Sequence, residues 1–270
     1  MSTQLNVGMA AAATAGGATR GRPPSGLRIL WLEARMEFFR LLRNPSFSVP
    51  IIVFPLMFYL LFAVMLGPPS AAGGVAGHML AKFTIFGVMA PGLFGLGVSL
   101  ALDRDRGLLE LKRALPMPAG AYLGAKVAMA GLFASIVSVA LMLLSATAGA
   151  VVLEAAQWVE LFVVSLLGVL PFCSLGLLVG TLTKGSAAPA VINLVYLPMS
   201  FLSGLLIPLN VLPHAVVQFA PLWPSYHLAQ LTQGIVDQSG PRGVLAHILA
   251  VVGEGVLFFA LARHRLAKLR

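Results

Sequence analysis

The sequence predicts an all-α membrane protein with six transmembrane helices, and three observations support this. Hydrophobic residues make up 59% of the chain and charged residues only 10%, which lies outside the range of water-soluble domains. Six apolar runs are each long enough to cross about 30 Å of hydrocarbon at about 1.5 Å per residue. Sixteen of the eighteen lysines and arginines fall in alternate connections between these runs or beside the termini. The net charge of +9 therefore indicates loops that face anionic lipid and cytoplasm rather than nucleic-acid binding.

Residues 1–26 are rich in alanine, glycine and threonine and predict a disordered cytoplasmic tail. The basic residues Arg20 and Arg22 follow the weakly apolar stretch, whereas a signal peptide carries its positive charges in front of the apolar region. The transmembrane domain is therefore expected to occupy residues 27–270.

The stretch from Leu27 to Arg43 has helical periodicity, with its apolar residues repeating at about 100° per residue. One arc contains Leu27, Leu30, Trp31, Ala34, Phe38, Leu41 and Leu42, while Arg28, Glu33, Arg35, Glu37 and Arg40 lie off it. We expect an amphipathic helix on the membrane surface, in contact with lipid through Trp31, Arg35, Phe38 and Arg40. Packing against a soluble core is the alternative, but the composition provides no such core.

The six apolar runs lie near residues 47–66, 83–102, 127–152, 158–182, 189–207 and 245–262. The third is long enough to imply a tilt or an end outside the bilayer. Only Lys82 and Arg242 fall in the connections on the outer side when the N-terminus is cytoplasmic. Positive charge accumulates on the cytoplasmic side of membrane proteins, so both termini are expected inside. The connection at 207–242 is too proline-rich to span and too apolar for a free loop, which favours short, half-buried helices on the outer side.

The densest group of charges follows the second run: Asp103, Arg104, Asp105, Arg106, Glu110, Lys112 and Arg113. Ionised side chains are costly in hydrocarbon, so this stretch is expected in water between two spans. Leu108, Leu111 and Leu115 share one face of a helix expected to begin near Asp105 and to stop at Pro116. Such a helix can dock its leucines on a soluble partner. A solvated loop that only fixes the topology is the alternative.

These stretches resemble the permeases of type 2 ATP-binding-cassette (ABC) transporters. Residues 103–110, the Leu-Pro pair at 115–116 and residues 123–126 resemble the first cytosolic loop of that family. Residues 203–213, followed by 221–230, resemble its outer re-entrant segment. The likeness extends over nearly everything after Leu27. It departs from the family at Leu108, where threonine is frequent, and in one extra residue before Lys126.

The resemblance implies a half-transporter whose surface helix and first cytosolic loop contact a separate ATP-hydrolysing subunit, which binds ATP-Mg. Two permease chains, as a homodimer or as a heterodimer with a similar permease, would form the pathway in the cell inner membrane, usually for export. The coupling set is Asp105, Arg106, Gly107, Leu108, Glu110, Leu111, Arg113 and Pro116. The outer gate set is Gly204, Pro208, Leu212, Pro213 and Pro224.

Catalytic, cofactor and metal sites are not expected in this chain. It has no glycine-rich loop ending in Lys-Ser or Lys-Thr, and residues 180–186 have the wrong spacing to cradle a triphosphate. The histidines are scattered, although His214 and His227 could approach each other. Energy must therefore come from a partner or from a gradient. A gradient-driven carrier predicts inverted repeats and ionisable residues at mid-membrane, and only Glu254 fits that description.

Three further features of the apolar runs need an interpretation. Glu254, near the middle of the last run, is either a proton carrier or, as we favour, a structural carboxyl that faces the bundle. Glu160 is interpreted as a boundary marker at the outer edge of its span. Gly176 and Gly180 form a small-xxx-small pair that allows close helix approach, although such pairs are frequent by chance in a chain with 28 glycines.

The cargo is expected to be a lipophilic drug, an antibiotic or a lipid-like molecule, because the spans are apolar and rich in methionine and phenylalanine. A lipid-linked polysaccharide is the alternative. Rows of aromatic side chains along the spans would favour a polysaccharide. The tryptophans of this chain are instead expected at the interface between membrane and water.

Overall fold

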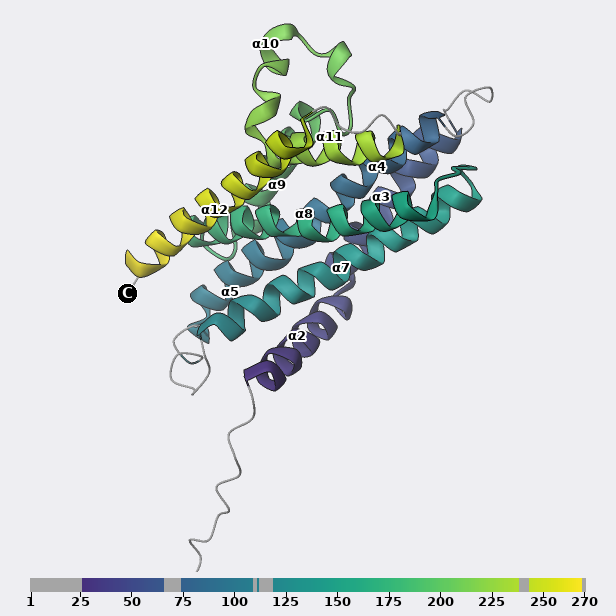
Figure 1. Ribbon diagram of the computed structural model, residues 1–270. Coiled ribbons are helices and arrows are strands. Elements are labelled where there is room, and N and C mark those ends of the chain that lie inside the picture. The colour runs from purple at the N-terminus through teal and green to yellow at the C-terminus, as the bar shows by residue number, and fades with distance from the viewer. Residues whose placement is uncertain (1–25, 66–73, 109–110, 112–118, 238–242, 269–270) are drawn as a thin grey trace, which may run out of the picture.

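The computed structural model describes residues 26–65, 74–108, 111, 119–237 and 243–268 (Figure 1). In this part of the chain the structure is helical, without a β-strand. The helices are α2 (Gly26–Leu42), α3 (Pro45–Tyr59), η1 (Leu60–Met65), α4 (Gly74–Ala90), η3 (Pro91–Val98), α5 (Ser99–Asp105), α7 (Ala119–Thr147), α8 (Ala155–Leu182), α9 (Ala188–Leu202), η4 (Leu209–Val211), α10 (His214–Val217), η5 (Ala220–Leu222), α11 (Pro224–Val236) and α12 (Val244–Lys268). The predicted tail at 1–25 lies outside the described residues.

Five helical stretches are long and apolar enough to cross a membrane: Pro45–Met65, Gly74–Asp105, Tyr122–Thr147, Ala155–Leu182 and Val244–Lys268. They confirm an all-helical, multi-span protein. The fifth predicted run, 189–207, forms only the 15-residue helix α9, which is about 22 Å long against about 30 Å of hydrocarbon. It ends early because Gly204 has a left-handed backbone, with φ +80°, and turns the chain.

The predicted bounds of the second and third spans are wrong by more than a helical turn. The second span begins at Gly74 rather than near residue 83, so Lys82 lies within α4 and not in a connection. A charged residue limited the predicted run, but one lysine does not end a helix. The third span occupies Tyr122–Thr147, within α7, rather than 127–152. Its end coincides with Gly149, where an added Cβ would lie 2.1 Å from the Tyr59 hydroxyl, and with Ala150 at φ 48°.

Helices α3, α4, α7 and α8 run side by side, and α12 lies against α8 on the outside of the bundle (Figure 1). The continuous helix formed by α4, η3 and α5 is central, and its side chains Leu80, Phe83, Met89 and Leu93 are fully buried. By contrast, α12 buries little of its apolar surface in this chain.

Glycines allow η3 and α8 to touch backbone to backbone. An added Cβ on Gly176 would lie 2.8 Å from the carbonyl oxygens of Gly92 and Leu93, and one on Gly180 would lie 2.6 Å from the carbonyl oxygen of Gly97. Neither contact could be relieved by rotating a side chain. The close approach predicted for the Gly176 and Gly180 pair is therefore confirmed.

The segment between α9 and α11, residues 204–223, contains the short helices η4, α10 and η5, as the sequence predicts. We call it the α10 loop; it projects from the bundle in Figure 1. The Ser203 and Ser225 hydroxyls hydrogen-bond at its base. Beyond it, α11 is held by the Thr232 hydroxyl, which donates to the Ala81 carbonyl oxygen, and by the Gln157 amide, which donates to that of Ile235 at 2.6 Å.

Candidate functional site at the charged end of the bundle

One end of the bundle collects the polar and charged groups. There α5 and α8 end, α7 and α9 begin, and α2 packs along the first turns of α7. We call it the charged end. The aromatic rings of Phe38 and Phe133 lie 5.0 Å apart between α2 and α7, and Leu30 fits over Gly124.

The centre of this end is a buried ion cluster made by Glu37, Asp103 and Lys126. Lys126 is only 1% exposed, and its ammonium donates to Glu37 Oε1 at 2.6 Å and lies 3.1 Å from Asp103 Oδ2. It also donates to the Ser99 hydroxyl at 2.8 Å. The Tyr122 hydroxyl donates to Asp103 Oδ2 at 2.7 Å. An ammonium so far from water is tolerated only because it is fully paired.

Arg40 completes the balance of charge. Its guanidinium lies 3.2 Å from Glu37 Oε1 and 3.7 Å from Asp103 Oδ1, from a more exposed position. Two cations then face two carboxylates, so the group is neutral as a whole. It joins three helices, because Glu37 and Arg40 come from α2, Asp103 from α5, and Lys126 from α7.

This cluster corrects two expectations. Glu37 was placed off the packed arc of its helix, yet it is buried, because it lies three residues after Ala34 and four before Leu41 on the face that meets α7. Asp103 was placed in a solvated loop, yet it is 2% exposed in the last turn of α5.

The next two residues bind α5 to α8. The Arg104 guanidinium donates to the carbonyl oxygens of Thr181, at 2.8 Å, and of Thr183. These carbonyls lie at the C-terminus of α8, where a helix lacks intrahelical donors and favours a cation. Asp105 Oδ2 accepts from the Gly185 backbone N–H at 2.6 Å, in the connection to α9.

The two ends of the connection between α5 and α7 are therefore joined. Asp103, before it, contacts Tyr122 and Lys126, which follow it. Arg104 and Asp105 hydrogen-bond the end of α5 to the end of α8 and to the α8–α9 connection. A displacement of residues 106–118 would thus act on α5, α7 and α8 together.

The coupling set lies partly within the described residues. Arg106 and Gly107 form an exposed turn, with Gly107 at φ +70°, so α5 ends at Asp105, where a new helix was expected to begin. Leu108 and Leu111 are helical, and Leu111 is 60% exposed. Glu110, Arg113 and Pro116 lie outside the described residues.

The four surface residues predicted on α2 separate onto two sides. Phe38 and Arg40 face α7 and the ion cluster. Trp31 is 58% exposed, and the Arg35 guanidinium lies 5.4 Å from its ring centroid. The side turned away from the bundle is therefore apolar with an arginine, and its contact with lipid stays a prediction.

The outer gate residues mark the turns of the α10 loop. Gly204 ends α9, and an added Cβ there would meet Leu209 at 2.7 Å. Pro208 and Leu212 flank η4, Pro213 precedes α10, and Pro224 is buried at the start of α11. These positions agree with a folded segment; its place on the outer side and its role as a gate stay predictions.

The histidine pairing is different from the one considered. His227 contacts His247 on α12, with 2.8 Å between their Nδ1 atoms, and His214 instead lies near Gln218. In the part of the chain that the structure describes, no three His, Cys, Asp or Glu side chains are placed to hold a metal. Glu254 Oε2 is buried without a hydrogen-bond partner among these residues, and its structural role stays a prediction.

The comparisons with known proteins agree with this arrangement. Residues 29–236 match the family model described as "ABC-2 type transporter". The chain is also 26% identical over 240 residues to "Putative transport permease YvfS" of Bacillus subtilis (strain 168), which covers 88% of this chain and 97% of that protein. The family match extends from α2 through the ion cluster to the end of α11. The chain belongs to the ABC-2 type transporter family.

Proposed function

We propose that this chain is the membrane-spanning subunit of an ATP-driven exporter, and that a separate ATP-hydrolysing subunit drives it by pushing on the connection between α5 and α7. Family membership implies an ATP-binding partner in general. The observation that carries the proposal is the joining of both ends of this connection, by Asp103 on one side and Tyr122 and Lys126 on the other. The partner would contact Arg106, Gly107 and the residues up to Pro116, together with α2.

In this proposal the charged end faces the cytoplasm of a cell whose inner membrane holds the protein, with both termini inside. Arginines and lysines at the ends of α5, α8 and α12 support that orientation. Helix α9 would complete six spans despite its length, with the α10 loop filling the remaining depth as the outer gate. Two permease chains, identical or similar, would form the pathway, and ATP-Mg would bind only to the partner subunits.

The proposed cargo is a lipophilic drug, an antibiotic or a lipid-like molecule. The described spans present mainly aliphatic and aromatic side chains, which suit an apolar cargo better than a heavily hydroxylated one. Reconstituted complex should then hydrolyse ATP faster with some lipophilic compounds and not with lipid-linked glycans.

The coupling claim is tested by charge reversal in the connection. Glu110→Lys combined with Arg113→Glu should release an ATP-hydrolysing subunit that copurifies with the wild-type chain. Arg263→Glu with Arg265→Glu, exposed residues at the same end on α12, is the matched control and should leave it bound. Retention of the partner by the first variant, or sustained uphill transport by the purified chain in vesicles free of nucleotidase, would overturn the proposal.

A further inference from the structure

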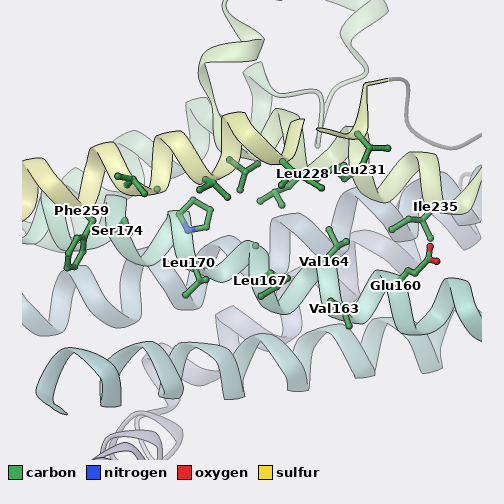
Figure 2. Close-up of a pocket in the computed structure, with 18 of the residues that line it drawn as sticks. Glu160, Val163, Val164, Leu167, Leu170, Ser174, Leu228, Leu231, Ile235 and Phe259 are labelled. Carbon is green, nitrogen blue, oxygen red and sulfur yellow. The ribbon is translucent and has the colours of Figure 1, made fainter. Parts of the chain in front are cut away.

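A long apolar groove runs between α8 and α12, with α11 closing one side. Its volume is about 810 Å³, and it is lined by Leu167 on α8, Leu228 on α11 and Val252 and Phe259 on α12, among others. Among the described lining residues, Glu160 and Ser174 are the polar side chains. Figure 2 shows Glu160 beside Ile235 towards one end and Ser174 near Phe259 towards the other.

One close approach between the two helices lies within the groove. An added Cβ on Gly255 would lie 3.6 Å from Pro171, so α12 approaches α8 closely there. Elsewhere the lining side chains remain open to the surroundings, with Leu167 58% and Val252 55% exposed. We call this feature the α8–α12 groove.

The position of the groove determines what can fill it. Both walls are helices long and apolar enough to cross the membrane, so the groove opens into the hydrocarbon. Water does not fill an apolar cleft of this kind, and the surrounding medium is lipid chain. From Glu160 to Ser174 the groove follows α8 for about 21 Å, which suits an extended chain rather than a compact ring.

Glu160 gives the groove a polar mouth. It lies five residues after the start of α8, or about 8 Å along the helix axis, which places it close to the boundary between the lipid headgroups and the hydrocarbon. The carboxylate is exposed and makes no ion pair or hydrogen bond to another described residue. An ammonium group at that depth would be its natural counter-ion.

We propose that the α8–α12 groove binds one phospholipid whose headgroup carries an ammonium group, with an acyl chain in the groove and the ammonium at Glu160. A purely anionic lipid would fill the same groove but would be repelled at its mouth. Bound lipid would cover α12, which this chain alone leaves largely exposed. The proposal does not depend on which cargo is exported or on the partner subunit.

Native mass spectrometry of the purified chain, loaded with equal amounts of phosphatidylethanolamine and phosphatidylglycerol of the same acyl chains, tests this directly. Wild type should retain one phosphatidylethanolamine in preference to phosphatidylglycerol by about fivefold. Glu160→Gln should bring the ratio to about one. Because Glu160 is exposed and unpaired among the described residues, this change should not affect folding.

A second pair of variants tests the place of binding. Val252→Trp would fill the groove and should abolish retention of both lipids. Leu249→Trp is the matched control, because Leu249 is 62% exposed on the same helix and does not line the groove. Equal retention of both lipids by wild type, or unchanged retention in Val252→Trp, would overturn the proposal. So would a wild-type dimer that Val252→Trp converts to monomer, since a second copy would then occupy the groove.

Discussion

The charged end and the α10 loop are attached to the same bundle by different chemistry. At the charged end, buried ions hold α2, α5 and α7 together through Lys126 and its two carboxylates. The α10 loop and α11 are attached mainly by neutral groups, such as the paired hydroxyls of Ser203 and Ser225 and the Gln157 amide. The exception among the described residues is Asp237 at the end of α11, whose carboxylate lies 2.9 Å from His78 Nε2 at a half-exposed position.

The difference has an energetic consequence. Separating a buried ion from its partners costs several kcal/mol, whereas a neutral hydrogen bond contributes about 0.5–1.5 kcal/mol net. The charged end should therefore move as one unit, and the α10 loop should be able to open at little cost. The proposed function needs this distribution, because the ATP-hydrolysing subunit would displace the charged end as a unit and the α10 loop would open in response.

Removing the central cation should have the largest effect. Lys126→Met leaves Glu37 and Asp103 buried with only part of their compensation, and we expect the free energy of unfolding to fall by about 3–5 kcal/mol. SDS titration followed by circular dichroism would measure this change. Adding Glu37→Gln should restore part of the loss, because one uncompensated carboxylate disappears.

The matched control is Lys184→Met, at an exposed lysine of the same end, which should change stability by less than about 0.5 kcal/mol. If both lysine variants lowered the free energy of unfolding by the same small amount, the buried ions would not stabilise the charged end. The contrast with the α10 loop would then disappear.

The glycine contact between η3 and α8 gives the next largest effect. It lies beside the charged end, because Gly180 is followed by Thr181, whose carbonyl oxygen accepts a hydrogen bond from Arg104. Gly180→Ala should lower the free energy of unfolding by about 1–3 kcal/mol, because its Cβ would meet the Gly97 backbone.

Gly131→Ala in α7 is the control, since its Cβ would make an ordinary 3.5 Å contact with Leu166. That change should stabilise the protein by about 0.5–1 kcal/mol through helix propensity alone. The same SDS titration measures the stability of both variants. If Gly131→Ala also destabilised the protein, the loss in Gly180→Ala could not be attributed to the close backbone contact between η3 and α8.

The sequence predicted the regular parts of the fold because apolar length and the distribution of lysine and arginine depend on local composition. Five of the six runs became helices long enough to span, and the proline-rich stretch after Leu202 became short helices as expected. The run at 189–207 was overestimated because hydropathy does not register the turn that Gly204 makes.

The ion cluster could not be predicted in the same way. Lys126 and Glu37 are 89 residues apart, and helical periodicity describes one helix at a time. A signal was nevertheless present, because Glu37 shares the face of Ala34 and Leu41, and a charge on a packed face needs a partner. His227 was likewise considered beside His214, which is nearer in sequence than its observed partner His247.

The smallest expected effect concerns the neutral attachment between α11 and α12. Burial lowers the pKa of His227 from about 6.5, and the neighbouring His247 lowers it further, although the hydrogen bond to the Pro221 carbonyl oxygen raises it. Neutral His227, donating from Nε2 to that oxygen, can accept at Nδ1 from His247; protonation removes this acceptor. His227 lies on α11, outside the five spans.

The unfolded chain therefore takes up this proton at a higher pH than the folded chain does. Stability from this pair should be constant above about pH 6.5 and should decline as the pH falls towards the lowered pKa. Thermal unfolding between pH 8 and 5 should show this decline in wild type and in His214→Gln, whose histidine is exposed on α10, but not in His227→Gln. If the pH dependence of thermal stability were the same in all three proteins, the pair of His227 and His247 would not contribute to the attachment of α11 to α12. Stability that rose with acidification would contradict the direction of the pKa shift itself.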